Sequence, residues 1–158
     1  MANILKMVLA LFLLILWSGF TPDADKPAYL IYNKNGNVVS YQSLKVQSTN
    51  SDLVFFGELH NNTIAHWLQI ELLQDLASDT SRSTLVGMEM FEADQQLLID
   101  EYFEGLISQS SFENEARLWN NYSTDYKPVL EFAKENDLEI DRHKYPEALC
   151  VCGLRWWA

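Results

Sequence analysis

Two short apolar runs in this sequence each end in side chains that can carry chemistry. Residues 53–56 lead to Glu58 and His60, and residues 84–91 contain Glu89. Alternate side chains of an extended segment lie on the same side, so Glu58 and His60 are expected to face together. Two carboxylates and an imidazole suit a general base for hydrolysis, a metal site with Glu58, His60 and Glu89 as ligands, or an axial ligand for haem iron. A glutamate at a strand end can also serve only as a favourable charge at the start of the following helix.

Three further side chains have a weaker indication of a functional role in the sequence. On a helix His66 would lie nearly opposite His60, so the two do not form an HExxH zinc motif, and we expect His66 to be a packing or hydrogen-bonding residue. Tyr122 and Tyr126 lie in the polar stretch 119–126, where tyrosines are usually surface or cap residues. Because a phenolate can ligate haem iron, both tyrosines are candidate haem ligands beside His60.

The elements that must position these side chains alternate between strand and helix. This alternation predicts an α/β fold, a parallel sheet with right-handed crossover helices. Ligands of such sheets bind beyond the carboxyl ends of the strands, which is where Glu58 and Glu89 stand. An Asn-Gly pair ahead of the first strand predicts a short β-hairpin. Apolar periodicity predicts strands at 53–56, 84–91 and 138–140, helices at 64–76, 93–103, 112–119 and 129–135, and hairpin arms at 29–32 and 38–41.

The spacing of the apolar residues also predicts which side chains are buried in two of these elements. The unbroken apolar run 53–56 is typical of a strand that is buried on both faces. The spacing of Leu97, Leu98, Tyr102 and Leu106 predicts that these four side chains form the inner face of their helix.

Length, charge and the N-terminal residues narrow the classes of partner and the location. The 158 residues are enough for one domain, and a net charge of −11 without a Lys/Arg cluster makes nucleic acid an unexpected partner. Lys6 and the apolar run 7–17 predict a secretory signal peptide over residues 1–20, or an uncleaved N-terminal anchor. We therefore expect export across the inner membrane, to the periplasm or a membrane-associated location. Residues 16–19 are similar to a lipoprotein box, but Phe20 replaces the cysteine that would be lipidated.

Four short motifs, taken together, resemble the ChaN-like haem-uptake family of the Tiki and erythromycin-esterase-like superfamily. They follow the order of that family's landmarks over about residues 53–140. The motifs are FFGELHNN at 55–62, HWLQ at 66–69, GMEMF at 87–91 and DYKP at 125–128.

The resemblance implies an envelope protein of bacterial iron uptake that binds haem or an iron complex. It implies ligand-binding roles for Glu58, His60 and Glu89, and a binding protein more than an enzyme. The partners it implies are an outer-membrane receptor and, in the full-length family, a second copy of the chain. Other members of the superfamily use a Gly-Glu-x-His-like motif for hydrolysis or metal binding, so a hydrolase with a divalent metal is the alternative.

The end of the chain departs from the pattern of the family. Members continue after the third strand with an Asn-x-Pro-Arg-Arg-Tyr-like segment, whereas residues 141–158 do not. The codons of 141–149, read one nucleotide later, permit a continuation of that kind. We therefore expect a linker and hairpin at 21–52, a partial ChaN-like α/β domain at 53–140 and an out-of-frame tail at 141–158. An incomplete sheet would expose an unpaired strand edge, so a nonfunctional remnant is the third interpretation.

Overall fold

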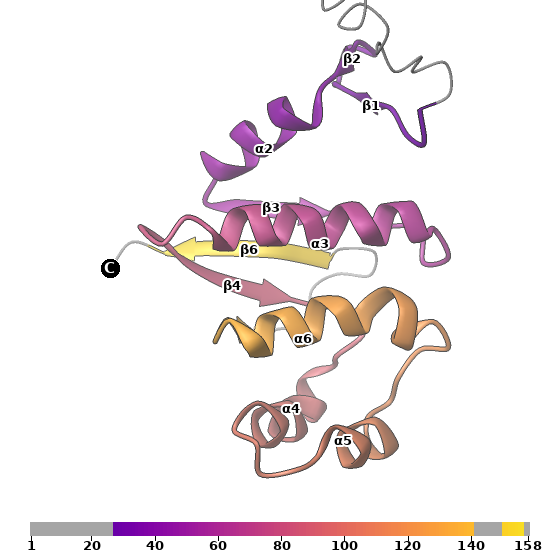
Figure 1. The fold of residues 1–158 in the computed structure, drawn as a ribbon, viewed down its shortest axis with the longest axis vertical. Coiled ribbons are helices and arrows are strands. Elements are labelled where there is room, and N and C mark those ends of the chain that lie inside the picture. Colours follow the sequence, from indigo (N-terminus) through magenta and orange to yellow (C-terminus); the bar gives the residue numbers. More distant parts are fainter. Residues whose placement is uncertain (1–26, 141–149, 157–158) are drawn as a thin grey trace, which may run out of the picture. The chain divides into compact units, whose positions relative to one another are not determined.

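The computed structural model describes residues 27–140 and the backbone of residues 150–156. The predicted signal segment at 1–20 and residues 141–149 of the predicted tail lie outside the described residues. Contacts divide the chain into two units, Met1–Leu30 and Ile31–Ala158. The second unit contains β1 (Ile31–Tyr32), β2 (Val38–Val39), α2 (Tyr41–Thr49), β3 (Leu53–Phe56), α3 (Thr63–Ala77), β4 (Ser83–Gly87), the 3₁₀ turn η1 (Ala93–Gln95), α4 (Gln96–Phe103), α5 (Gln109–Glu115), the π-helical turn η2 (Tyr122–Tyr126), α6 (Lys127–Glu135), β5 (Glu139–Ile140) and β6 (Cys150–Trp156) (Figure 1).

The predicted hairpin is confirmed. Strands β1 and β2 pair antiparallel, with Ile31 opposite Val39. Asn33 holds the turn because its side-chain oxygen accepts hydrogen bonds from the backbone of Asn35 and Asn37, each at 3.0 Å. Gly36 has a φ of 78°, a left-handed conformation that glycine adopts without the steric penalty of a side chain.

The main sheet has the order β3-β6-β4-β5. Strand β5 pairs parallel with β4, as predicted, but β6 lies between β3 and β4 and is antiparallel to both. The alternation of strands and helices is therefore confirmed, whereas the prediction of a purely parallel sheet is wrong. Strands β3 and β4 still run in the same direction, because each is antiparallel to β6. The pattern within a strand indicates its exposed faces but leaves open which strand, in which direction, satisfies its edge.

Strand β3 is confirmed in position but not in burial. Leu53 and Phe55 are exposed, at 42% and 48% of their surface, while Val54 and Phe56 are only partly buried. The strand thus shows the alternation of a half-buried strand instead of burial on both faces.

Helix α3 forms because its apolar side chains recur at helical spacing and because Asn62 caps its first turn. The Asn62 side-chain oxygen accepts hydrogen bonds from the backbone N–H groups of Ile64 and Ala65, each at 3.1 Å. The buried side of the helix packs against β4, β6 and α6. With α3 packed in this way, the first turn of the helix lies beside the end of β3.

Replacing Asn62 with alanine is expected to lower the free energy of unfolding by about 1 kcal/mol, because two backbone N–H groups lose their acceptor. Urea unfolding followed by far-ultraviolet circular dichroism measures the change. Asn62→Asp is the control, since a carboxylate can cap the same groups. Equal stability of the alanine variant and the original chain would contradict the role of this cap.

Helix α2 was not predicted, because its sequence lacks a strong apolar stripe. Ser40 caps it by accepting a hydrogen bond from the backbone of Ser43 at 3.2 Å. Tyr41 and Lys45, one turn apart, both donate to the carboxylate of Asp75 on α3, at 2.9 and 2.5 Å. A contact with another helix therefore holds α2 in place, and such contacts are not visible in local periodicity.

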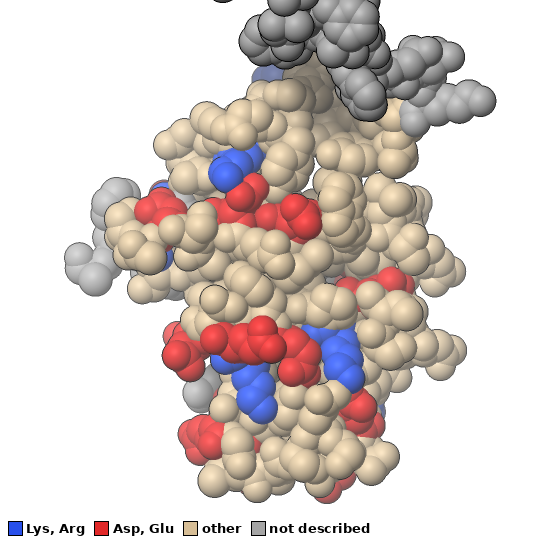
Figure 2. All heavy atoms as spheres, viewed as in Figure 1, with Lys and Arg blue, Asp and Glu red and all other residues tan. Residues whose placement is uncertain are grey.

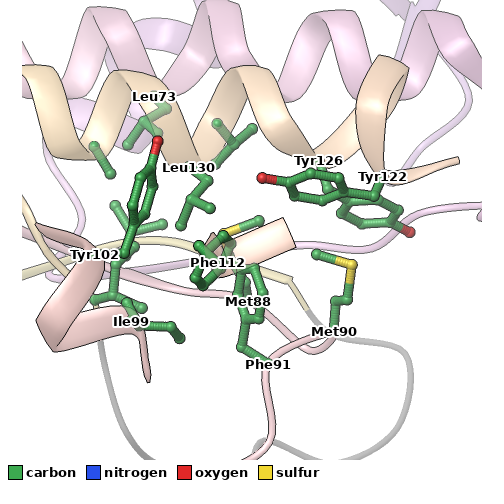
Figure 3. Packing of buried hydrophobic residues seen from close by; sticks show 14 residues of the cluster. Leu73, Met88, Met90, Phe91, Ile99, Tyr102, Phe112, Tyr122, Tyr126 and Leu130 are labelled. Carbon is green, nitrogen blue, oxygen red and sulfur yellow. The ribbon is translucent and has the colours of Figure 1, made fainter. Parts of the chain in front are cut away.

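The apolar core gathers side chains from α3, α4, α5, α6, η2 and the segment after β4 (Figure 3). On α4 the buried side chains are Ile99 and Tyr102, whereas Leu97 and Leu106 are 71% and 69% exposed. The predicted inner face was therefore right for Tyr102, right in part for Leu98, which packs partly buried against the core, and wrong for Leu97 and Leu106. Leu106 lies beyond the helix, which ends at Phe103 and is followed by Gly105 with a φ of 73°. Leu97 precedes the buried Ile99 by two positions, roughly 200° around the helix, and so lies on the opposite face.

The surface is acidic on the face shown in Figure 2, where carboxylates gather over α3 and α6 with fewer basic groups beside them. Lys127 pairs with Glu113 at 2.7 Å, and Arg117 pairs with Asp94 and Glu92. The hydrogen bond and charge of Arg117 lower the pKa of the Asp94 carboxyl. No helix within residues 27–140 and 150–156 has both the length and the apolarity to cross a membrane.

Candidate functional site

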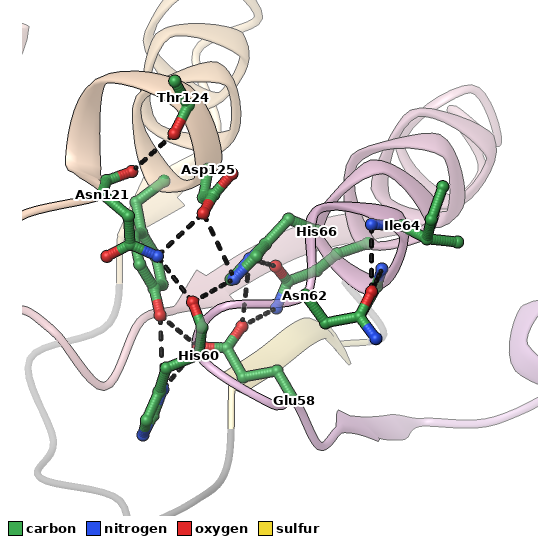
Figure 4. Close-up of polar contacts among 11 residues, drawn as sticks. Glu58, His60, Asn62, Ile64, His66, Asn121, Thr124 and Asp125 are labelled. Atoms are coloured by element: carbon green, nitrogen blue, oxygen red, sulfur yellow. Dashed lines mark hydrogen bonds and ion pairs between the residues drawn. The ribbon is translucent and has the colours of Figure 1, made fainter.

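Glu58 is the centre of a buried polar cluster at the end of β3. Its side chain is only 2% exposed, and both carboxylate oxygens have partners (Figure 4). Oε1 accepts a hydrogen bond from the Tyr126 hydroxyl at 2.5 Å and lies 3.2 Å from Nδ1 of His60. Oε2 accepts from Nε2 of Gln69 at 3.2 Å and lies 3.3 Å from Nδ1 of His66. A carboxylate with this many donors is held in one orientation.

His60 is the member of the cluster that reaches the surface. Its side chain is 51% exposed, and the Tyr126 hydroxyl lies 3.4 Å from its Nδ1. The Trp119 ring meets it edge to face with the ring centres 4.8 Å apart. The ring borders a shallow groove of about 400 Å³, which is lined by His60, Asn61, Leu118, Trp119, Asn120 and Asn121. The chemistry of the cluster is thus accessible to a ligand through His60.

His66 and Asp125 are buried beneath this surface, and Asn121, which also lines the groove, is bonded to this layer. Nε2 of His66 lies 3.1 Å from the backbone oxygen of His60 and 3.9 Å from Oδ2 of Asp125. The Asn121 amide donates to that same backbone oxygen at 2.6 Å and to Asp125 at 2.8 Å. The backbone at His60 is therefore held by hydrogen bonds from two other elements, α3 and the residue before η2.

The π-helical turn η2 brings Asp125 and Tyr126 into the cluster. The sequence indicated a polar loop with surface or cap tyrosines, but Asp125 and Tyr126 are buried, at 6% and 3% exposure. A π turn carries an extra residue per turn, so neighbouring side chains can point in directions that an α-helix would separate, and such turns often occur at functional sites. The aromatic rings of Tyr126 and His66 meet edge to face with their centres 4.8 Å apart.

Of the two candidate tyrosines, only Tyr126 contacts Glu58 and His60 in the described residues. The Tyr122 hydroxyl is buried in the core without a hydrogen-bond partner among the described residues. Burial, and next the negative charges of Glu113 and Glu131, raise the pKa of the Tyr122 hydroxyl above its ordinary value. This environment disfavours the phenolate that would ligate haem iron.

Glu89 lies in the turn that follows β4, and its side chain is partly buried. No hydrogen bond or ion pair joins it to Glu58 or His60 in the part of the chain that the structure describes. Its role at the site stays a prediction. Among residues 27–140 no group of three or more His, Cys, Asp or Glu side chains has the arrangement of a metal site.

Sequence reasoning treated Glu58 and His60 as site residues and His66 as a hydrogen-bonding residue, and the structure brings all three together. It missed Gln69, Asn121 and Asp125 as members of the cluster. Gln69 falls on the apolar side of α3, where a buried polar residue needs a partner, and that conflict was the signal available. No local pattern marks Asn121.

A family model described as "Haem-binding uptake, Tiki superfamily, ChaN" matches residues 45–149, which is more than half of the chain. The match includes every residue of the Glu58 cluster and the groove beside His60. Neither a curated protein nor a solved structure matches the chain.

Proposed function

The chain belongs to the ChaN family of haem-binding uptake proteins in the Tiki superfamily, and on this premise we propose that it binds haem or a related iron complex in the groove beside His60. The observation that carries the proposal is the pairing of an accessible imidazole with a buried carboxylate. Nδ1 of His60 lies 3.2 Å from Oε1 of Glu58, while the ring is half exposed.

This pairing suits a metal-ligating histidine. An imidazole that binds iron through one nitrogen commonly donates from the other nitrogen to a carboxylate, which fixes its tautomer and its orientation. With Nδ1 donating to Glu58, the lone pair of the His60 ring is on Nε2, for which no hydrogen bond is found within residues 27–140. His60 would hold the iron of a bound haem through this nitrogen. The iron of a bound haem would supply the coordination bond to the ring.

The groove has the composition that a haem-like molecule requires. Trp119 offers an aromatic surface for a flat macrocycle, and Asn61 and Asn120 offer amide donors for carboxylate groups. The groove residues in the described part of the chain include no Asp or Glu, although the protein as a whole is strongly acidic. A ligand that carries propionate groups would therefore contact no carboxylate of the groove lining.

Under this proposal the protein carries haem in the cell envelope after export directed by the apolar run 7–17. An outer-membrane receptor and a second copy of the chain are its proposed partners. Glu89 is proposed as a further ligand-binding residue.

Titration of the purified full chain with haemin is expected to shift the Soret band and to saturate at a defined ratio. His60→Ala should weaken binding by about 10- to 100-fold, because the ligating group and its orientation are lost together. Absorbance spectroscopy measures the Soret shift and the binding ratio. Quenching of tryptophan fluorescence measures the affinity, because Trp119 lies beside the expected site.

Tyr32→Ala is the control for adsorption of haemin to exposed aromatic surface, since Tyr32 is 57% exposed and lies on the hairpin. It should leave the titration unchanged. An unchanged spectrum and affinity in the His60→Ala variant would exclude His60 as the ligand. Ester or peptide turnover that a chelator abolishes, without any haemin response, would favour the hydrolase instead.

A further inference from the structure

We propose that the pocket between the first half of α3 and the residues of η2 is a second ligand site, which binds a primary ammonium group on a short apolar stem. The pocket has a volume of about 320 Å³. It shares no lining residue with the groove beside His60, although a hydrogen bond joins Asn121 in the groove to Asp125 in the pocket. Binding at this site does not depend on haem.

The pocket has apolar sides and a buried polar floor. Asp125 and His66 are 6% and 3% exposed, so they lie at its bottom. Trp67 and Ile70 of α3 and Pro128 of α6 line its sides. Trp67 is 45% exposed, as a residue at the opening would be. A ligand that enters would therefore contact carbon atoms along its length and meet a carboxylate at its inner end.

One oxygen of the Asp125 carboxylate is left for a ligand. Oδ2 accepts a hydrogen bond from the Asn121 amide at 2.8 Å and lies 3.9 Å from Nε2 of His66. Oδ1 points away from these partners (Figure 4), and it has no hydrogen bond or ion pair within residues 27–140. In the described part of the chain no Lys or Arg side chain lines the pocket or pairs with Asp125. Because a buried carboxylate oxygen without a donor is costly, a ligand with a cationic donor would stabilise it.

The lining favours an ammonium group over a metal ion. A metal ion requires several protein ligands, and among the described residues no group of three or more His, Cys, Asp or Glu side chains has that arrangement. An ammonium group requires acceptors for three N–H donors. Asp125 supplies a carboxylate oxygen, and the hydroxyl oxygens of Thr63 and Thr124 are further acceptors in the lining. Trp67 adds to the preference, because tryptophan is the aromatic side chain that attracts cations most strongly.

The apolar sides of the pocket determine the rest of the ligand. A bare ammonium ion would leave the side chains of Trp67, Ile70 and Pro128 without contacts, whereas a chain of methylene groups would pack against them. Two kinds of molecule carry an ammonium group on such a stem. One is a free alkyl amine, and the other is a peptide with a lysine side chain. Both present the same chemistry to the pocket, so the experiment below includes a probe of each kind.

The site is tested by NMR titration of the full chain, labelled with nitrogen-15, with n-butylammonium chloride at constant ionic strength. The signals of the Trp67 indole N–H and of the Thr124 and Asp125 amides are expected to shift and to saturate. 1-Butanol has a similar stem without the charge, and methylammonium has the charge without the stem. Each should bind at least tenfold more weakly than n-butylammonium, because each lacks one of the two contacts.

The amide of N-acetyl-lysine distinguishes the two sources of the ammonium group. Tighter binding than that of n-butylammonium would assign the site to a lysine side chain of a peptide, because the backbone would then add contacts. Equal or weaker binding would assign the site to a free amine. Both results support a site for an ammonium group on an apolar stem.

Asp125→Asn tests the carboxylate itself. The amide keeps the shape of the side chain and an oxygen that accepts from Asn121, but it removes the negative charge. Binding of n-butylammonium is expected to weaken at least tenfold. Asp137→Asn is the matched control, since Asp137 is exposed and does not line the pocket. Its φ of 52° is a conformation that asparagine also adopts, and binding should be unchanged in this variant.

Three results would overturn this site. The first is equal binding of 1-butanol and n-butylammonium to the unaltered chain, a comparison that requires no variant to fold. The second is the absence of saturable shifts at Trp67, Thr124 and Asp125. The third is a folded Asp125→Asn variant that binds n-butylammonium as the unaltered chain does, because Asp125 would then serve only to hold Asn121. These titrations contain no haem, so a failure of the proposed function would show only in the haemin titration.

Discussion

Replacing Glu58 with alanine is expected to lower the free energy of unfolding by about 3–5 kcal/mol and to abolish the haemin response. The change removes the acceptor for the Tyr126 hydroxyl and the Gln69 amide, and it leaves His66 beside the other buried carboxylate only. Buried donors that lose their acceptor each add about 1–3 kcal/mol to the cost. Urea unfolding, followed by circular dichroism, measures the change.

Two further variants are compared with Glu58→Ala. Glu58→Gln keeps the shape of the side chain and one acceptor oxygen, so it should be destabilised less than the alanine variant. Glu89→Gln alters a carboxylate that has no hydrogen bond or ion pair to the cluster in the described residues, and its stability should change by less than about 0.5 kcal/mol. A Glu58→Ala variant as stable as the Glu89 variant would show that the cluster does not hold the fold together.

Replacing Phe112 with alanine is expected to lower the free energy of unfolding by about 3–5 kcal/mol. Phe112 is fully buried, at 0% exposure, and connects α5 to the core. Its ring stacks on Tyr102 with the centres 4.7 Å apart and the planes at 17°, and it lies 6.0 Å from the ring of Phe91. Alanine would leave a cavity between three elements that cannot close without moving them.

Thermal and urea unfolding of the Phe112→Ala variant measure this loss. Leu97→Ala is the control, because Leu97 is 71% exposed and its removal should change stability by less than about 0.5 kcal/mol. Phe112 does not line the groove beside His60, so the haemin response of the folded fraction should persist. A loss below about 1 kcal/mol would indicate that the segment around α5 repacks.

Part of the site could be predicted from the sequence because its residues are close along the chain. Glu58 and His60 follow the same apolar strand at alternate positions, and extended geometry alone brings their side chains to one side. The helix that supplies His66 also begins within a few residues, so its position could be predicted from the apolar spacing. The family resemblance, carried by short motifs in the same segments, agrees with the family match to residues 45–149.

The remaining site residues could not be predicted, because they arrive from distant segments. Tyr126 reaches Glu58 across a sequence separation of 68 residues, and Asn121 reaches the backbone of His60 across 61. Their directions depend on the π-helical geometry of η2, for which the polar stretch 119–126 carries no recognisable signal. Sequence reasoning therefore kept Tyr122 and Tyr126 together as candidates, whereas only their opposite environments distinguish them.

The sequence by itself indicated most strands and helices of the described residues, although not α2 or β6, and the family to which the chain belongs. These properties depend on periodicity and on neighbours along the chain, which act locally. Tertiary structure alone decided that β6 separates β3 from β4, that Leu53 and Phe55 stay exposed, and that two histidines and a tyrosine share one buried carboxylate. Strand order, burial and hydrogen-bond partners depend on contacts between segments that are distant in the sequence. The free energy of such a contact depends on both segments, so neither segment's sequence alone predicts it.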